Sequence, residues 1–275
     1  MCGVTLVLAM VLGKGVVVAA DTRVSGYGVY GEERKVYPVT YEDNGREYGL
    51  AVVSGAGVSA LVKGAYELIR NKYTNLMEHV KSKEGAARNP NKREVEAIVR
   101  ETEVELMSRY SKLRELGMTD FPDILLATVT CEGEPLLYLF EAGLANPMHE
   151  APGYVILGHG ELTGARLLLT LLGYKAREKQ YWDHSILPVF IIDVVSAVDP
   201  TVSPFSDPHS SIYIRYSEES KTVVAGPLTP EAFKTAKNSV QNRIKAFQLI
   251  WELMEKEGEE KILKTLKKRL EKLEE

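Results

Sequence analysis

Apolar and polar residues follow two kinds of pattern along the chain, short apolar runs and helical periods. Residues 4–12 and 16–20 are β-branched and aliphatic runs on either side of a Gly-Lys-Gly turn at residues 13–15, so they predict a buried hairpin. Residues 27–41 and 48–53 are two further strand candidates. We therefore expect four strands at the start of the chain.

Two long helical patterns come next. Apolar residues return with a helical period over residues 58–80, and a second stripe starts after Asn91 and ends at Gly117. Residues 124–130 and 136–140, joined by polar and turn-forming residues, then predict a second hairpin. Strands are thus followed by two amphipathic helices and then by strands again.

The second half of the chain continues this order with shorter elements. Residues 154–157 predict a strand, 162–172 and 187–198 predict helices, and 211–215 and 222–224 predict two last strands. Because each amphipathic helix must bury one face on a sheet, separate blocks of this kind favour an α+β protein in which two packed sheets carry helix pairs outside. A parallel βαβ arrangement would require strict alternation of strands and helices.

The last part of the chain has a different character. Thr229 and Pro230 are a capping residue and a proline at the first helical position, and a helix rich in Lys and Glu is expected after Gly258. We expect a main domain of residues 1–226 and a helical extension of residues 227–275. The apolar stripes of the extension require a partner surface, either on the body of the molecule or on a neighbouring subunit.

Composition excludes several classes of function. The 275 residues include 38 acidic and 34 basic side chains, which gives a net charge of -4 and no excess of cations for a nucleic-acid backbone. The two cysteines, Cys2 and Cys131, have neither disulfide-framework nor metal-site spacing, so a cytoplasmic location is expected. Lys14 interrupts the apolar start of the chain, and no basic leader precedes it, so we expect no membrane or export segment.

Standard catalytic and cofactor motifs do not occur in the sequence. It contains no phosphate-binding G-x-x-x-x-G-K-S/T loop, no H-E-x-x-H metal motif and no G-x-S-x-G nucleophile elbow. The five histidines are scattered, so their spacing predicts no metal site. Candidate chemistry therefore remains only near the first hairpin.

The geometry of the first hairpin places a hydroxyl near a carboxylate. If its turn is centred within residues 13–14, the numbers of facing residues sum to about 27, so Thr5 lies opposite Thr22 and one position from Asp21. Neighbours along a strand point to opposite faces, so Thr5 and Asp21 converge only where the strand ends twist or bulge. Lys35 on the next predicted strand is expected close to Asp21. A threonine hydroxyl becomes a strong nucleophile when a base such as its own free α-amine activates it.

Residues 15–23, Gly-Val-Val-Val-Ala-Ala-Asp-Thr-Arg, resemble the segment after the first turn of proteasome beta subunits and their bacterial relatives, including the ancestral beta-type (Anbu) proteins. In that family the nucleophilic threonine stands ten residues before the glycine of this turn and sixteen before the aspartate, and both counts lead to Thr5. The family's lysine, followed by two apolar residues, corresponds to Lys35, although the stretch from Asp21 is about two residues shorter than usual.

Three further segments resemble the same family in the same order. The Ser-Gly-Ala-Gly run that contains Gly55 stands where the family has a backbone N–H that binds the oxyanion, and we assign Gly55 to that role. The Gly-His-Gly around His159 resembles a Gly-Ser-Gly, with His159 in place of the serine. The segment with Asp199 and Ser203 resembles the one whose aspartate and serine orient the terminal amine and the hydroxyl, with the serine one residue later.

The resemblance implies an N-terminal-nucleophile (Ntn) hydrolase of the proteasome-subunit type, a four-layer αββα sandwich with an added C-terminal helical extension. It implies a threonine protease or amide hydrolase in which Thr5 attacks a peptide or amide carbonyl, with Asp21 and Lys35 tuning the site and no cofactor or metal. The family usually assembles in rings, so the expected partners are the peptide or amide substrate and copies of the same chain, in a ring or a dimer.

Two questions stay open at the level of sequence. Val4 precedes Thr5, where the family has a glycine or an initiator methionine, and Cys2 is a rival nucleophile because Met-Cys-Gly also opens the glutamine amidotransferases of this superfamily. Thr5 is preferred because Cys2 would pair near Ser25, farther from Asp21. The alternatives to a hydrolase are a catalytically inactive structural or assembly subunit and an acyl-transferase or ligase of the same fold.

Overall fold

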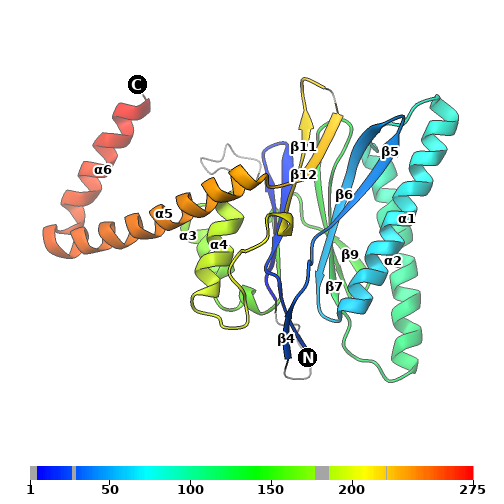
Figure 1. Cartoon of the computed structure of the whole chain (residues 1–275), viewed down its shortest axis with the longest axis horizontal. Coiled ribbons are helices and arrows are strands. Elements are labelled where there is room, and N and C mark those ends of the chain that lie inside the picture. Colours follow the sequence, from blue (N-terminus) through cyan, green and yellow to red (C-terminus); the bar gives the residue numbers. More distant parts are fainter. Residues whose placement is uncertain (1–4, 27–28, 177–185, 221, 275) are drawn as a thin grey trace.

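The computed structural model of the protein describes residues 5–26, 29–176, 186–220 and 222–274. Within these residues, the strands form two five-stranded antiparallel sheets and one two-stranded hairpin (Figure 1). The strand order of the first sheet is β10-β1-β2-β11-β12. Its members are β1 (Val7–Leu12), β2 (Gly15–Ala20), β10 (Tyr154–Leu157), β11 (Ser211–Ser217) and β12 (Thr222–Pro227).

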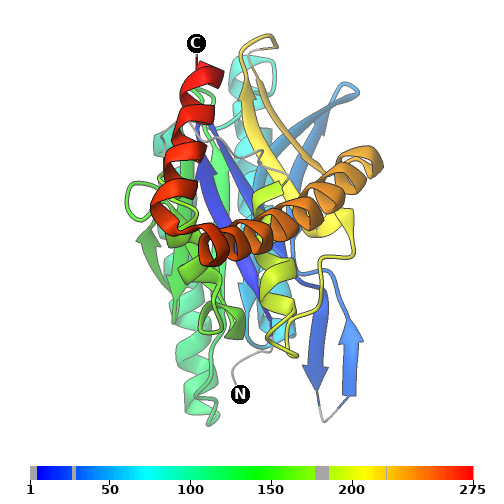
Figure 2. The ribbon, with the colours of Figure 1, turned by 90° about the vertical axis from the view of Figure 1, so that its left-hand side faces the viewer.

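The second sheet has the order β5-β6-β7-β8-β9. Its members are β5 (Tyr37–Asp43), β6 (Arg46–Ala56), β7 (Asp123–Val129), β8 (Pro135–Glu141) and β9 (Leu144–Pro147). The separate hairpin consists of β3 (Arg23–Gly26) and β4 (Val29–Glu32), and it projects from the body of the molecule (Figure 2).

The helices are α1 (Ser59–Glu84), α2 (Lys92–Glu115), α3 (Ala165–Leu171), α4 (Ile186–Ser196), α5 (Pro230–Glu257) and α6 (Glu259–Glu274), with short 3₁₀ helices η1 (His159–Glu161) and η2 (Pro208–Ser210). Two of the six α-helices in the described residues, α2 and α5, begin at side-chain caps. Asn91 and Glu94 form a reciprocal capping box at the start of α2. Thr229 caps α5 and Pro230 occupies its first position, as the sequence predicts.

β1 and β2 are buried on both faces of the first sheet, which explains their continuous apolar runs. Val7, Ala9 and Val11 of β1 belong to an apolar cluster shared with strands of the second sheet. Leu8 and Met10 point to the opposite face and belong to a cluster with α3, α4 and the first half of α5. The alternation of side chains along one strand therefore serves two separate cores.

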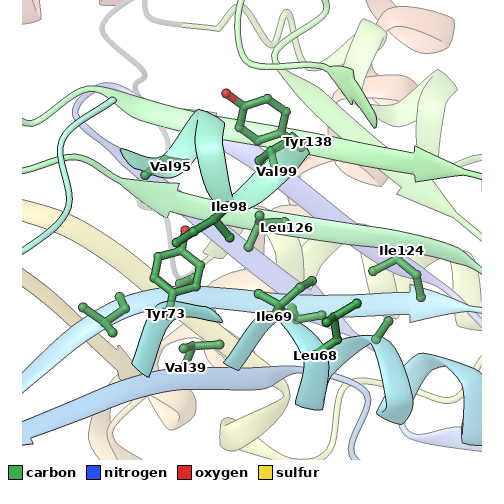
Figure 3. Packing of buried hydrophobic residues seen from close by; sticks show 14 of the residues in the cluster. Val39, Leu68, Ile69, Tyr73, Val95, Ile98, Val99, Ile124, Leu126 and Tyr138 are labelled. Atoms are coloured by element: carbon green, nitrogen blue, oxygen red, sulfur yellow. The ribbon is translucent and has the colours of Figure 1, made fainter. Parts of the chain in front are cut away.

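The other face of the second sheet is covered by α1 and α2. Ile69 and Tyr73 of α1 and Ile98 of α2 pack with Val39 and Leu126 of the sheet (Figure 3). Buried residues recur three or four positions apart along each helix, as at Ile69, Tyr73, Met77 and Val80 of α1, which is why each helix buries one stripe on the sheet. The α+β class expected from the sequence is confirmed.

One predicted strand is wrong in its extent. The expectation of a single strand over residues 27–41 is replaced by β4 and β5, separated by residues 33–36. These residues connect the β3–β4 hairpin to the second sheet, and the side chain of Lys35 turns inward to hydrogen-bond Asp21. The chain thus opens with six strands in the described residues instead of the predicted four, and the short, largely exposed β9 has no counterpart among the predicted elements.

The C-terminal helices extend away from the body (Figure 1). Ala236 and Val240 of α5 are buried against α4 and the first sheet, whereas Phe247 and Trp251, farther along the predicted stripe, are 51% and 71% exposed. The division into residues 1–226 and 227–275 stays a prediction. None of the helices in the described ranges combines the length and the apolar character needed to cross a membrane.

Gly49 of β6 lies close to Ala225 of β12, and this contact allows a test of the fold. A Cβ added to Gly49 would lie 2.3 Å from the Cβ of Ala225 and 2.9 Å from its nitrogen. We expect Gly49→Ala to lower the free energy of unfolding by about 1–3 kcal/mol, because the two strands must move apart.

Gly226→Ala is the matched control, because no atom of the described residues lies within 4 Å of its added Cβ. Urea unfolding of both variants measures the difference. Equal stability of Gly49→Ala and Gly226→Ala would show that the two strands are not in this close contact.

Candidate active site

The register of the first hairpin brings Thr5 to Asp21. Val7 pairs with Ala20, so the numbers of facing residues sum to 27, as predicted. The pairing continues to the next residues, where the amide of Asp21 donates to the carbonyl of Leu6 at 3.0 Å. Beyond that point the Thr5 hydroxyl donates to Asp21 Oδ1 at 2.9 Å, and the Leu6 amide donates to the same oxygen at 2.9 Å. The proximity expected from the hairpin geometry is therefore a direct hydrogen bond.

Lys35 completes a buried cluster with these two residues. Its Nζ lies 2.6 Å from Asp21 Oδ1 and also donates to the Thr5 hydroxyl and to the carbonyl of Arg23. The Ser54 hydroxyl donates to the Lys35 carbonyl at 2.7 Å, which ties this segment to β6. Thr5, Asp21 and Lys35 are 4%, 0% and 7% exposed. A hydroxyl, a carboxylate and an ammonium thus share one site with little solvent.

Burial changes the acidity of Lys35. It lowers the pKa of the ammonium below its ordinary value, and the carboxylates of Asp21 and Glu33 oppose this shift without cancelling it. A lysine with a lowered pKa gives up its proton more readily than a surface lysine, so Lys35 can take part in proton transfer with the hydroxyl that it contacts.

Ser203 holds the second oxygen of Asp21. The Ser203 amide donates to Asp21 Oδ2 at 3.1 Å, and the Arg23 amide donates to the same oxygen at 3.2 Å. The Ser203 hydroxyl in turn accepts from the amide of Thr22 at 3.1 Å. Ser203 therefore fixes the orientation of the carboxylate that contacts Thr5.

Asp199 is the centre of a second polar cluster. Its Oδ1 accepts from the amide and the hydroxyl of Thr201 at 2.9 and 2.5 Å, and its Oδ2 accepts from the Thr163 hydroxyl at 2.8 Å and lies 2.9 Å from Nδ1 of His159. Burial alone would raise the pKa of this carboxyl, but the hydrogen bonds from Thr201, His159 and Thr163 outweigh it and hold the pKa well below its usual range. Asp199 is thus a carboxylate at neutral pH.

The segment around His159 lies directly against Thr5. The Gly160 amide donates to the Thr5 carbonyl at 3.3 Å. Gly158 has a φ of +86°, and an added Cβ there would lie 2.3 Å from the Thr5 carbonyl oxygen, so both the conformation and the close contact require glycine. The second polar cluster therefore adjoins the first.

Gly55 lies near the end of β6. Ser54, the residue before it, donates to the carbonyl of Lys35, so Gly55 lies next to the contact between β6 and the Lys35 segment. An added Cβ on Gly55 would lie 2.6 Å from the Asp123 carbonyl oxygen, so a side chain does not fit between β6 and β7. The assignment of its N–H as an oxyanion donor stays a prediction.

The structure brings together four of the six residues selected from the sequence. Thr5, Asp21, Lys35 and Ser203 form one connected hydrogen-bond network. Asp199 makes its hydrogen bonds within the neighbouring cluster, and Gly55 follows Ser54, which contacts the Lys35 carbonyl. The rival nucleophile Cys2 lies outside the described residues.

Five contributors were not selected from the sequence. Leu6, Thr22 and Arg23 supply backbone donors, and their positions beside Thr5 and Asp21 were the available signal. Thr163 and Thr201 donate to Asp199; Thr201 lies within the segment that contains Asp199 and Ser203, whereas Thr163 belongs to no recognised motif. Across the part of the chain that the structure describes, no group of three or more His, Cys, Asp or Glu residues could hold a metal ion.

Comparisons with known proteins bear on the fold. No protein-family model and no curated protein sequence matches the chain. Among solved structures, it is similar to a Gly-1 mutant of Anbu from Hyphomicrobium sp. strain MC1, with 17% identity and a TM-score of 0.58 over 89% of this chain and 96% of that one. It is likewise similar to Anbu from the same strain, with 17% identity and a TM-score of 0.57 over 88% and 97% of the two chains. These likenesses confirm the resemblance to proteasome beta-subunit-like proteins at the level of the fold.

The acidity of Asp199 generates a prediction about stability and pH. Because its folded pKa lies below the unfolded value of about 3.9, the carboxylate stabilises the fold above that pH and loses this contribution as the pH falls through the folded pKa. We expect Asp199→Asn to lower the free energy of unfolding at neutral pH by about 1–3 kcal/mol, since buried hydrogen bonds to a charged group are lost.

Urea unfolding at several pH values measures this effect. The difference in stability between wild type and Asp199→Asn should be full at about pH 5 and should shrink below about pH 4. Glu255→Gln, at an exposed glutamate of α5, is the control and should change little. A difference that grows as the pH falls would contradict the assignment of a stabilising carboxylate.

Proposed function

From the premise of the proteasome-like fold, we propose that the protein is an amide or peptide hydrolase with Thr5 as its nucleophile. One observation carries this proposal: the buried Thr5 hydroxyl is hydrogen-bonded to both the Asp21 carboxylate and the Lys35 ammonium. A solvated surface threonine has no such partners, whereas a nucleophile needs groups that accept its proton and stabilise the resulting oxyanion.

The proposed reaction begins when removal of residues 1–4 frees the α-amine of Thr5. That amine takes the hydroxyl proton, and Oγ1 attacks the substrate carbonyl. The Lys35 ammonium stabilises negative charge on Oγ1, and the N–H of Gly55 is proposed to bind the carbonyl oxygen as it becomes an oxyanion. Collapse of the intermediate breaks the amide C–N bond, and the leaving nitrogen takes the proton. Water then hydrolyses the ester on Thr5.

Asp21 and Ser203 support this chemistry through position. Asp21 receives hydrogen bonds from Thr5 and Lys35 and holds the two groups side by side. Ser203 donates to the other oxygen of Asp21 and restrains its rotation. Positioning of this kind lowers the barrier because the reacting groups are already in contact.

The four-layer arrangement of the chain and its assembly are part of the same proposal. The three apolar clusters, one shared by the sheets and one beneath each set of helices, support the four-layer αββα sandwich of the Ntn fold with residues 227–275 as an extension. The exposed Phe247 and Trp251 support assembly with further copies of the chain. A cytoplasmic location and a peptide or amide substrate complete the proposal, and no step of the reaction requires a cofactor.

A second candidate function rests on the residue before Thr5. Val4 occupies the place where a glycine or an initiator methionine would be expected, so the Thr5 nitrogen stays in a peptide bond unless the chain is cut there. An uncut chain would keep the fold as an inactive structural or assembly subunit. Cys2 as nucleophile, and acyl transfer to an amine in place of water, are further outcomes that experiment can separate.

Covalent labelling tests the proposed nucleophile. We expect a peptide electrophile that must bond both the hydroxyl and the α-amine of an N-terminal threonine to form an adduct at Thr5, located by mass spectrometry of peptides. Thr5→Ala should abolish the adduct and lower hydrolysis of a reactive peptide amide by at least about 10³-fold. Thr265→Ala, at an exposed threonine of α6, should keep both activities.

The site of modification decides among the alternatives. Circular dichroism and thermal unfolding first establish that Thr5→Ala is folded. Labelling at Cys2 by a thiol-directed reagent, together with unchanged hydrolysis by Thr5→Ala, would assign the reaction to the cysteine. No adduct and no hydrolysis with any wild-type preparation would support the inactive subunit.

A further inference from the structure

The carboxylate of Asp199 has no acceptor site left for Thr5. An ionised carboxylate offers about four lone-pair positions for donors. In the described residues, four donors fill them: two from Thr201, one from Thr163 and one from His159. The role implied by the family resemblance, in which this aspartate orients the terminal amine, therefore does not fit the hydrogen bonding of Asp199.

The same contacts fix the proton on His159. An ionised carboxylate only accepts hydrogen bonds, so Nδ1, which lies 2.9 Å from Asp199 Oδ2, must carry the proton. With the proton on Nδ1, a neutral ring has its lone pair on Nε2, and within the described residues no group hydrogen-bonds Nε2. The side chain of Asp199 is 1% exposed, whereas that of His159 is 45% exposed. A buried carboxylate thus orients a ring that reaches solvent.

This ring is carried by the segment that touches the nucleophile. Gly160, on one side of His159, donates to the Thr5 carbonyl, and Gly158, on the other side, would place a Cβ 2.6 Å from Cγ2 of Thr5. Thr5, Asp21 and Lys35 are themselves buried and hydrogen-bonded to one another. A partly exposed ring on a segment that contacts Thr5 is therefore separate from the groups that hydrogen-bond the Thr5 hydroxyl.

We propose that His159, oriented by Asp199, is the general base that activates water to hydrolyse the acyl ester on Thr5. This inference rests on the proposed function. Nε2 removes a proton from water as the water oxygen bonds to the acyl carbon. The tetrahedral intermediate then collapses, the bond between the acyl carbon and Oγ1 breaks, and Nε2 gives Oγ1 the proton that it took from water. Thr163 and Thr201 are positioning residues that hold Asp199.

Separate measurement of acylation and deacylation tests the proposal. The processed wild-type chain is mixed with an activated acyl substrate that releases a chromophore. Acyl-Thr5 is then detected in quenched samples by mass spectrometry. We expect His159→Ala to acylate within about threefold of wild type but to deacylate about 10²–10⁴-fold more slowly, so that the acyl-enzyme accumulates. Imidazole added to the solution should restore part of the lost deacylation rate.

Two control variants separate chemistry from structure. His159→Gln retains an amide that can donate to Asp199 but cannot take a proton, so it should deacylate as slowly as His159→Ala. His209→Ala, at an exposed histidine elsewhere, should behave as wild type. If His159→Gln deacylates at the wild-type rate, His159 only positions its neighbours and the proposal is overturned.

The remaining outcomes are also decisive. A wild-type chain that begins at Thr5 and is never acylated overturns the proposed function and this inference with it. A wild type that turns over, together with a His159→Ala variant that turns over equally fast, overturns the inference alone. If the variants do not fold, ¹⁵N NMR of the wild-type ring decides: a proton on Nδ1 of His159 is expected, and a neutral ring with the proton on Nε2 contradicts the proposal.

Discussion

The buried carboxylate of Asp21 is the constraint on which the site depends. An unpaired carboxylate without solvent costs several kcal/mol, so the fold must bring donors to it. Those donors come from four separate parts of the chain: Thr5 and Leu6, Arg23, Lys35 and Ser203. Satisfying one charge therefore joins the residues just before β1, the start of β3, the segment between β4 and β5, and the loop after α4. The geometry around the Thr5 hydroxyl follows from that requirement.

A second buried carboxylate lies four residues before Ser203 in the same loop. Asp199 organises His159, Thr163 and Thr201, whereas Ser203 contacts Asp21. One short segment thus fixes two carboxylates with different partners. In the proposed reaction Asp21 positions the groups for attack by the Thr5 hydroxyl, and Asp199 orients His159 for the later attack by water. Separate carboxylates allow each proton acceptor to have its own environment.

The sequence predicted the parts of the site that depend on local pattern. The hairpin register followed from a short turn between two apolar runs, and it led to the contact of Thr5 with Asp21. The strand expected over residues 27–41 was wrong because residues 33–36 connect two different sheets and Lys35 there pairs with a buried charge, a tertiary effect that no local pattern records. Thr163 was missed because it lies 36 residues from Asp199 and meets it only in the fold.

The central claim is that Thr5 becomes the first residue of the working protein, since the α-amine of Thr5 is the proposed base. The intact mass of the purified chain, combined with sequencing of its first residues, tests this claim most directly. The account predicts a mass that lacks residues 1–4 and a sequence that begins with Thr5. An active enzyme whose mass shows Val4 still attached, with or without the initiator methionine, would contradict it.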